Sequence, residues 1–419
     1  MRRMNTVVAV LAATLLTTAP LVLAPPAAAA ELPYSDQCSF PNGKYPGRPW
    51  SLQRVLLDEL WSQSRGKGVR VAVIDTGVDV TNPQLTDAVD AKSGRNLLDK
   101  NLKDENGNPV KRGKENGTSD EVGHGTKVAG IIAARPAEGT GFVGLAPEAK
   151  IIPIQQNDEE GHGTADTLVQ AIHHAIQADA DVINISQDTS NATKPTPKLQ
   201  LAINEALSQK IVVVASAGND GLGGNAKRTY PASYKGVLAV AASDRNNERA
   251  SFSQAGDFVG VAAPGVDMIS TVPEGGHCSD NGTSFSAPYV AGVAALIKAK
   301  HPTWTPQQIV AQIEQTAERT IAGHDRNVGW GVVDPVRALT EDEQPLESPN
   351  PRQGLGKPEA PAAAKFQVGE TAEERNARLA TYVAVGAVVL VAGLGGTAVA
   401  IRDARRRRGR QLEGGTWTR

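Results

Sequence analysis

Strands and helices alternate along the middle of this 419-residue chain, and this alternation limits the possible folds more than any other feature. Short apolar runs predict strands, whereas longer runs with apolar residues three and four positions apart predict helices. The predicted strands cover residues 150–154, 181–186, 211–216 and 237–242, and the predicted helices cover residues 126–134, 164–178, 197–209, 284–300 and 306–320. Such alternation predicts an α/β domain in which helices cover both faces of a mostly parallel sheet.

An additional buried strand is predicted ahead of this region, where the apolar run Val71-Ala72-Val73-Ile74 ends in Asp75. Functional residues of parallel sheets lie beyond the carboxyl ends of the strands, so Asp75 is expected where a site would form. Apolar spacing also predicts one helix over residues 52–61. Residues 87–120 are polar and interrupted by glycines, and they predict a long surface loop.

Two further motifs contain a base and a nucleophile. Gly123-His124-Gly125-Thr126 puts a histidine between two glycines ahead of a helical run, and Asn281-Gly282-Thr283-Ser284 puts a serine near the start of another helix. The free N–H groups and the positive dipole end of a helix start favour a developing negative charge. Taken alone, Ser284 is more simply explained as a helix N-cap, so its assignment depends on all three motifs together.

The three motifs follow the chain order Asp, His, Ser, which is the order found in subtilisin. The sequence therefore resembles the subtilisin-like serine proteases, or subtilases, over residues 51–340. This resemblance implies a three-layer subtilisin-like fold and a serine endopeptidase. In that enzyme Ser284 would attack the peptide carbonyl, His124 would transfer the proton, and Asp75 would orient His124.

The resemblance extends to residues around the substrate. Asn219 follows a predicted strand and matches the asparagine of the family's oxyanion hole, although a generic turn asparagine is the alternative. Ser186 and Gly218 would border the bound peptide, which subtilases bind as an added strand. Gln187 and Asp188 replace the apolar residue and the glycine that usually follow this serine. We therefore expect a narrower substrate preference than in degradative relatives.

A second copy of the histidine motif, Gly161-His162-Gly163-Thr164, competes with the first for the role of the base. Only the first copy continues as Val128-Ala129-Gly130-Ile131-Ile132-Ala133, which matches the family around its base. We therefore assign the base to His124 and expect His162 at the rim of the cleft. No residue spacing predicts a metal site, and no cofactor is expected.

Residues 1–30 have the pattern of a secretory signal peptide, with Arg2 and Arg3 ahead of an apolar stretch and Ala28-Ala29-Ala30 at its end. A membrane anchor that is retained is the alternative. Secretion implies an oxidising environment, so the only two cysteines, Cys38 and Cys278, predict a disulfide. It would join a short extension, residues 31–50, to a loop ahead of Ser284. Two free thiols are the alternative.

Residues 341–380 are rich in proline and glutamate and predict a disordered linker. The uncharged residues 381–401 are long enough to cross a hydrocarbon core about 30 Å thick, and they predict one transmembrane helix. Residues 402–419 begin with a run of arginines, so the positive-inside rule predicts a cytoplasmic tail and an extracytoplasmic protease. A nucleic-acid patch is the alternative for these arginines, but a net charge of −2 and 4% aromatic residues argue against a nucleic-acid partner.

The full arrangement of signal peptide, cysteine-bearing extension, subtilase domain, linker, single span and basic tail resembles the mycosins. These are the membrane-anchored subtilases of bacterial type VII secretion. The resemblance implies a protease of the cell membrane that cleaves protein or peptide substrates and contacts the secretion complex. The alternative is a scaffolding component of that complex, in which proteolysis is secondary.

Overall fold

The computed structural model describes residues 38–101, 103, 107, 112–158, 163–186, 195–222, 228–351 and 372–412. The predicted signal peptide and residues 352–371 of the predicted linker lie outside the described residues. The chain divides into a large unit, Met1–Leu355, and a small unit, Gly356–Arg419.

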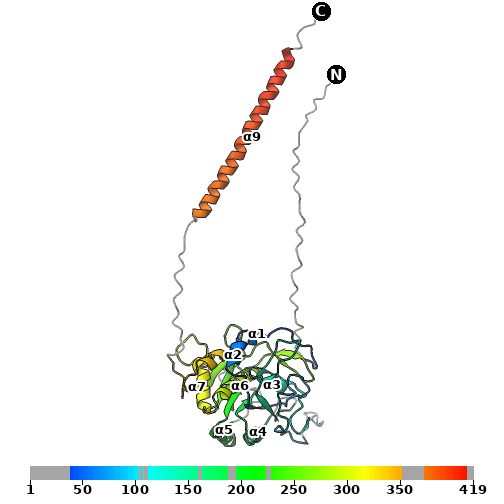
Figure 1. The fold of residues 1–419 in the computed structure, drawn as a ribbon, viewed down its shortest axis with the longest axis vertical. Helices are drawn as coiled ribbons and strands as arrows, with labels where there is room; N and C mark the ends of the chain where they lie inside the picture. The colour runs from blue at the N-terminus through cyan, green and yellow to red at the C-terminus, as the bar shows by residue number, and fades with distance from the viewer. Residues whose placement is uncertain are drawn as a thin grey trace, which may run out of the picture. The chain divides into compact units, whose positions relative to one another are not determined.

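A seven-stranded parallel sheet forms the centre of the large unit (Figure 1). Its strand order is β2-β3-β1-β4-β5-β6-β7, and every neighbouring pair is parallel. The strands are β1 (Arg70–Asp75), β2 (Arg95–Asn96), β3 (Lys150–Gln155), β4 (Val182–Ile185), β5 (Val212–Ser216), β6 (Leu238–Ser243) and β7 (Val259–Pro264). The predicted parallel sheet is confirmed, and each strand predicted from apolar runs agrees with the structure to within one residue at either end.

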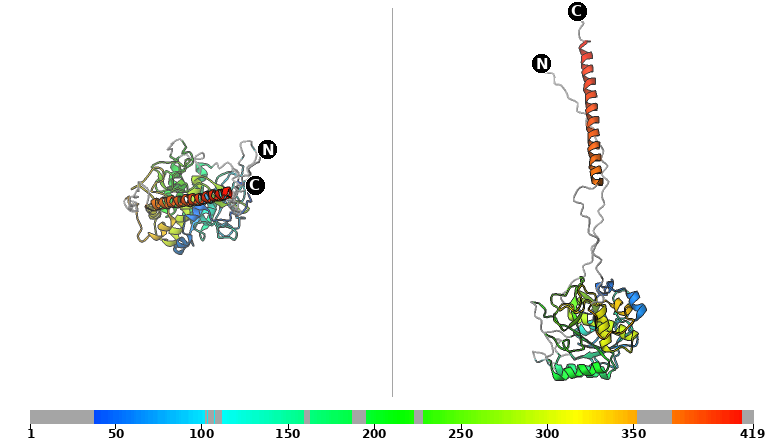
Figure 2. Two further views of the ribbon diagram at one scale, coloured as in Figure 1. Left: turned by 90° about the horizontal axis from the view of Figure 1, so that it is seen from above. Right: turned by 90° about the vertical axis from the view of Figure 1, so that its left-hand side faces the viewer.

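Helices cover both faces of this sheet and complete three layers. One face carries α3 (His124–Ala133), α6 (Thr283–Lys300) and α7 (Pro306–Thr316), and the other carries α4 (Ala165–Gln177) and α5 (Pro197–Ser208). Figure 1 labels α4 and α5 next to each other at the bottom of the large unit, and the right-hand view of Figure 2 shows green helix in the same outer layer. The alternation of side chains along β1 explains this packing. Val71 and Val73 contact the core on the α3 and α6 side, whereas Ala72 and Ile74 contact the core on the α4 and α5 side.

The helix α6 is the central helix of the large unit. Its residues from Thr283 to Lys298 are all buried, as expected for a helix that is apolar on every side. Small residues let it approach its neighbours closely, since a β carbon on Gly292 would lie 3.1 Å from the Cβ of Leu145. The surrounding core therefore fixes the start of α6, where Ser284 lies.

Several predicted segments differ from the structure. The single helix predicted for residues 52–61 is two helices, α1 (Trp50–Gln53) and α2 (Leu57–Gln63), because a tight turn joins the Leu57 N–H to the Val55 carbonyl. The predicted loop at residues 87–120 contains β2, which pairs with β3 at the sheet edge. Helix α7 ends at Thr316, four residues early, because Glu318 pairs instead with the extended backbone of Val332.

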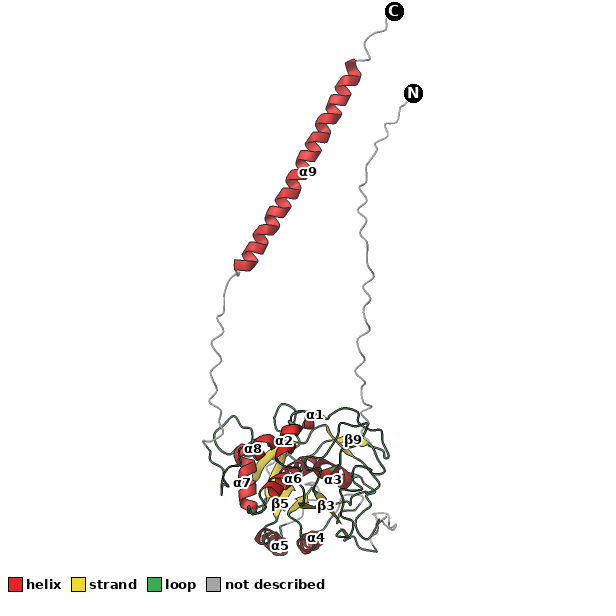
Figure 3. Ribbon diagram, viewed as in Figure 1, coloured by secondary structure: helices red, strands yellow, loops and turns green. Residues whose placement is uncertain are grey.

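A hairpin of β8 (Met268–Thr271) and β9 (His277–Asp280) leads into α6 (Figure 3). The loop predicted here is wrong, because Cys278 lies in the strand β9. The backbone of Asn42 and Gly43 pairs with Gly275 and His277, which joins the N-terminal extension to the hairpin. A short helix, α8 (Pro335–Thr340), follows near the end of the large unit.

In the small unit the described residues form one long helix, α9 (Ala372–Leu412). Within the described part of the chain, it is the one helix whose length and composition would allow it to cross a membrane. Its apolar window has a mean hydropathy of 2.2, and the helix includes the predicted span at residues 381–401.

Candidate active site

Asp75 and His124 form a hydrogen-bonded pair beyond the carboxyl end of the sheet. Asp75 is the fully buried last residue of β1, and His124 is the first residue of α3. The Oδ1 atom of Asp75 lies 2.7 Å from Nδ1 of His124 and also accepts the backbone N–H of Thr76 at 2.8 Å. A carboxylate at Nδ1 keeps a proton on that nitrogen, so Nε2 of His124 is the atom that can accept a proton from a nucleophile.

The glycine before His124 is required by the backbone. Gly123 caps α3 with a φ of 81°, a left-handed conformation that side chains disfavour. A β carbon on Gly123 would also lie 3.2 Å from both Phe40 and Pro273. The start of α3 is therefore packed closely against the N-terminal extension and the β8–β9 hairpin.

Asp120 connects the Asp75 turn to the start of α3, and it is not among the site residues predicted from the sequence. Its Oδ1 atom accepts hydrogen bonds from the Thr76 hydroxyl at 2.9 Å and from the N–H groups of Val122 and Gly123 at 3.1 and 2.8 Å. Its Oδ2 atom accepts from the backbone N–H and the hydroxyl of Thr126 at 2.8 and 2.7 Å. Asp120 lies four residues before the first residue of α3 and is not at the N-cap position, so no helix-start signal in the sequence indicates it.

Ser284 is the second residue of α6, as predicted, and its neighbour Phe285 contacts the imidazole. The ring centroids of Phe285 and His124 are 5.2 Å apart. Ser284 is 5% exposed, and its backbone belongs to the first turn of an 18-residue helix. The first turn of that helix supplies N–H groups and a positive dipole end next to the serine hydroxyl.

Asn219 lies three residues after β5 and is oriented by Thr283. Its Oδ1 atom accepts the Thr283 backbone N–H at 2.9 Å and the Thr283 hydroxyl at 3.0 Å. This turns the Nδ2 atom toward the serine, because a β carbon on Gly282 would lie 3.5 Å from Asn219 Nδ2 and 2.9 Å from Ser284 Oγ. The side-chain donor and the serine hydroxyl therefore border the same small space.

The charges around His124 favour its protonated form. Burial lowers the pKa of His124, but the negative charge and hydrogen bond of Asp75 outweigh burial, so the pKa lies above its ordinary value of 6.5. Lys127 lowers this pKa and Asp280 raises it. The His124 side chain is 27% exposed, so it combines access to solvent with a fixed carboxylate partner.

Ser186 and Gly218, the remaining predicted site residues, are among the described residues. Ser186 is buried and its hydroxyl accepts the Asn184 side-chain amide at 2.8 Å. The N–H of Gly218 donates to the Thr283 hydroxyl at 3.1 Å, which ties the end of β5 to the start of α6. Their roles in binding substrate stay predictions. Residues 187 and 188 lie outside the described residues, and so does His162, the histidine of the second motif.

The predicted disulfide between Cys38 and Cys278 is confirmed, with a Cα–Cα distance of 6.0 Å. It joins the extension to β9, and Cys278 lies five residues before Thr283, the first residue of α6. The Tyr45 N–H donates to His277 Nδ1 at 3.0 Å, and His277 Nε2 lies 2.7 Å from Gln84 Oε1. The extension is therefore held against the hairpin by a covalent bond and by a buried histidine.

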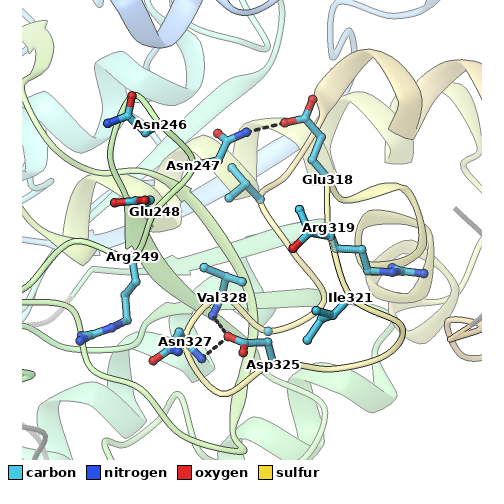
Figure 4. A pocket seen from close by; sticks show the side chains of 13 residues that line it. Asn246, Asn247, Glu248, Arg249, Glu318, Arg319, Ile321, Asp325, Asn327 and Val328 are labelled. Atoms are coloured by element: carbon cyan, nitrogen blue, oxygen red, sulfur yellow. Dashed lines mark hydrogen bonds between the residues drawn. The ribbon is translucent and has the colours of Figure 1, made fainter. Parts of the chain in front are cut away.

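A separate pocket of about 740 Å³ contains none of these residues. It is lined by residues 246–249, 318–321, 325, 327–329 and 332 (Figure 4). Asn247 donates to Glu318 at 2.6 Å, and Asp325 accepts the N–H groups of Asn327 and Val328 at 2.6 and 3.0 Å. These contacts join the loops that line the pocket, and none of the predicted site residues lines it.

Comparison with known proteins gives a consistent result. The model of the Subtilase family matches residues 66–331. Subtilisin E of Bacillus subtilis (strain 168) is 38% identical over 287 residues, which are 68% of this chain and 69% of that protein. The solved structure of the MycP3 protease from the type VII (ESX-3) secretion system is 32% identical with a TM-score of 0.59, and the match covers 72% of this chain and 90% of that chain. MycP1 from Mycobacterium smegmatis is 31% identical with a TM-score of 0.61, covering 80% of this chain and 91% of that chain.

Proposed function

The chain belongs to the subtilase family of serine proteases, and from this premise we propose that it hydrolyses peptide bonds through Asp75, His124 and Ser284. The observation that carries this proposal is the 2.7 Å hydrogen bond between Asp75 and His124, beside the start of the helix that contains Ser284. An imidazole with Nδ1 held by a buried carboxylate is prepared to accept a proton at Nε2.

In the proposed reaction the Ser284 hydroxyl attacks the carbonyl carbon of the peptide bond while His124 Nε2 takes its proton. Asp75 stabilises the imidazolium that forms. The Asn219 side-chain N–H and the backbone N–H of Ser284 donate to the oxyanion. His124 then gives the proton to the leaving amine, and a water molecule repeats the sequence on the acyl-enzyme to release the second product.

We further propose that α9 anchors the protease in the cell membrane, with the large unit outside the cytoplasm. A mean hydropathy of 2.2 supports the membrane span, and the arginines that follow residue 401 support the orientation. The domain boundaries at residues 30, 50, 340, 380 and 401 are part of the proposal. Because similar structures come from type VII secretion systems, the proposed substrates are proteins that such a system exports.

The test of the proposed chemistry is the variant Ser284→Ala, assayed with a fluorogenic peptide. We expect kcat/KM to fall by about 10⁴-fold or more, because the nucleophile is lost while the fold is kept. His124→Ala should have a similar effect, whereas His162→Ala should not. Ser208→Ala is a matched control, because Ser208 is an exposed serine at the end of α5. Full hydrolysis by Ser284→Ala would contradict the proposal.

A cellular experiment separates proteolysis from scaffolding. If export of substrates fails both in the deletion strain and in the strain that carries Ser284→Ala, the chemistry is required. If export survives Ser284→Ala but fails on deletion, the protein acts in the secretion complex as a scaffold.

A further inference from the structure

We propose that the ion pair between Lys127 and Asp280 positions the imidazole of the base His124 for proton transfer with Ser284. Lys127 lies three residues after His124 in α3, and Asp280 lies four residues before Ser284 at the end of β9. The pair thus connects the two elements that carry the base and the nucleophile. This inference rests on the proposed function of His124 and Ser284.

The pair has the geometry of a fixed contact. Lys127 Nζ lies 2.7 Å from Asp280 Oδ2, and the Lys127 side chain is only 9% exposed. The other carboxylate oxygen of Asp280 accepts the backbone N–H of Asn281 at 2.8 Å, so the carboxylate is held from both sides. Charge-assisted hydrogen bonds of this length are the stronger ones in proteins.

An aromatic ring completes the connection between the pair and the base. Lys127 Nζ lies 5.9 Å from the ring centroid of Phe285, and the same ring lies 5.2 Å from the imidazole of His124. Phe285 is 2% exposed and follows Ser284 directly in α6. A cation within about 6 Å of a ring is attracted to its face. Lys127, Phe285 and His124 therefore pack as one group next to the nucleophile.

The burial of Lys127 makes the pair necessary. A buried ammonium without a partner is costly, so removal of the Asp280 charge would force the Lys127 side chain toward solvent. That movement would disturb the packing of Phe285 against His124. A misplacement of about 1 Å at the reacting groups can lower a rate by about 10²-fold.

The charges of the pair also predict a change in the pH dependence of kcat/KM, which loss of stability alone does not produce. The charged groups around His124 are Asp75 at the end of β1, Asp120 ahead of α3, Lys127 within α3 and Asp280 in β9. Lys127 lowers the pKa of His124 and Asp280 raises it. Neutralising each partner should therefore shift the acid limb of the kcat/KM profile in opposite directions.

The experiment measures kcat and KM between pH 5 and 9 for the full-length protein and three variants. We expect about a tenfold lower kcat in Lys127→Met and in Asp280→Asn, with little change in KM. The acid limb should move up by roughly half a pH unit in Lys127→Met and down by a similar amount in Asp280→Asn. In the double variant the limb should return near its wild-type position while kcat stays low.

Lys300→Met is the matched control. Lys300 pairs with Asp342 at the same 2.7 Å distance, but it is the last residue of α6, whereas Ser284 is the second. This variant should change stability without moving the acid limb. Asp280→Glu and Lys127→Arg keep both charges and should recover kcat, which keeps the test valid if a neutral variant fails to fold.

Three results would overturn the positioning role. Lys127→Met and Asp280→Asn could keep the wild-type kcat, or the acid limbs of these two variants could move in the same direction. The third is that Asp280→Glu and Lys127→Arg fail to recover kcat. These outcomes are distinct from failure of the proposed function. If the proposed function fails, Ser284→Ala remains active. If only the positioning role fails, Ser284→Ala is inactive and the variants of Lys127 and Asp280 behave as wild type.

Discussion

One buried carboxylate, Asp120, joins the turn that carries Asp75 to the helix that carries His124. It accepts five hydrogen bonds while being only 5% exposed. Three of the donors are backbone N–H groups around the start of α3, so the carboxylate fixes the backbone on both sides of His124. A group of this kind contributes to stability and to geometry at once.

Asp120→Asn should therefore reduce both stability and turnover. An amide nitrogen would face donor groups in place of one carboxylate oxygen, and we expect a loss of about 2–4 kcal/mol in the free energy of unfolding. Denaturant unfolding followed by tryptophan fluorescence measures this loss, and peptide hydrolysis measures the turnover. Asp257→Asn is the control, because Asp257 is exposed and pairs with Arg326 at the surface. An Asp120→Asn variant as stable as this control would contradict the assignment.

His277 should make stability depend on pH in the opposite sense to His124. Burial, with a smaller contribution from the charge of Lys44, lowers the pKa of His277 from 6.5 to about 4. The folded state therefore prefers the neutral ring, whose Nδ1 accepts the Tyr45 N–H. Stability from this preference is complete above pH 6.5 and is lost as the pH falls toward 4, and the loss reached at pH 4 is about 3 kcal/mol.

The measurement is the unfolding temperature of wild type and His277→Gln between pH 4 and 8. The wild-type protein should lose stability more steeply below pH 6.5 than the variant. His173→Gln serves as the control, because His173 lies at the surface of α4 near Glu205. Parallel curves for wild type and His277→Gln would show that the ring does not remain neutral in the folded state.

At the level of elements, the N-terminal extension is bonded to the β8–β9 hairpin, and this hairpin directly precedes α6 in the chain. The disulfide Cys38–Cys278 closes a loop with a sequence separation of 240 residues, so it restricts the unfolded chain strongly. Reduction should lower the free energy of unfolding by about 2–5 kcal/mol. Denaturant unfolding with and without a reductant measures this effect. The double variant Cys38→Ser/Cys278→Ser should be equally destabilised and insensitive to the reductant, and a reductant effect on that variant would point to another cause.

Elements with a repeating apolar pattern could be predicted from the sequence, because burial in the core selects that pattern. Strand β3 and helix α4 agree with their predictions to within one residue at each end. In contrast, β2 consists of two residues, and its Asn96 is held by a side-chain amide bonded to the Arg112 carbonyl. Such a strand has no apolar period, so a polar segment of this kind is read as a loop.

The same limit applies to the site. Asp75, His124 and Ser284 could be predicted as catalytic residues because each lies in a local motif with a glycine nearby. Lys127 and Asp280 are 153 residues apart, and neither belongs to a motif that indicates the other. Contacts between charged side chains depend on the packing of α3 against the hairpin, which only the tertiary structure supplies.

At the scale of the whole molecule, the division after Leu355 predicts that catalysis and membrane attachment can be separated. A chain that ends at Leu355 keeps every residue of the proposed active site and lacks α9. We expect it to hydrolyse the test peptide with a kcat/KM within about twofold of that of the full chain. The full chain should sediment with membranes and resist alkaline extraction, because one apolar helix of this length inserts stably.

Fractionation of cells that express each form tests this separation, and protease treatment of intact cells tests the orientation. An epitope after residue 412 should be protected in intact cells, because the arginines after residue 401 favour the cytoplasmic side. Sedimentation of the shortened chain with membranes would instead favour an anchor within residues 1–30. If the shortened chain also resisted alkaline extraction, the signal peptide prediction would be replaced by its alternative, since an uncleaved apolar stretch is held in the bilayer whereas a chain bound to a membrane complex is extracted.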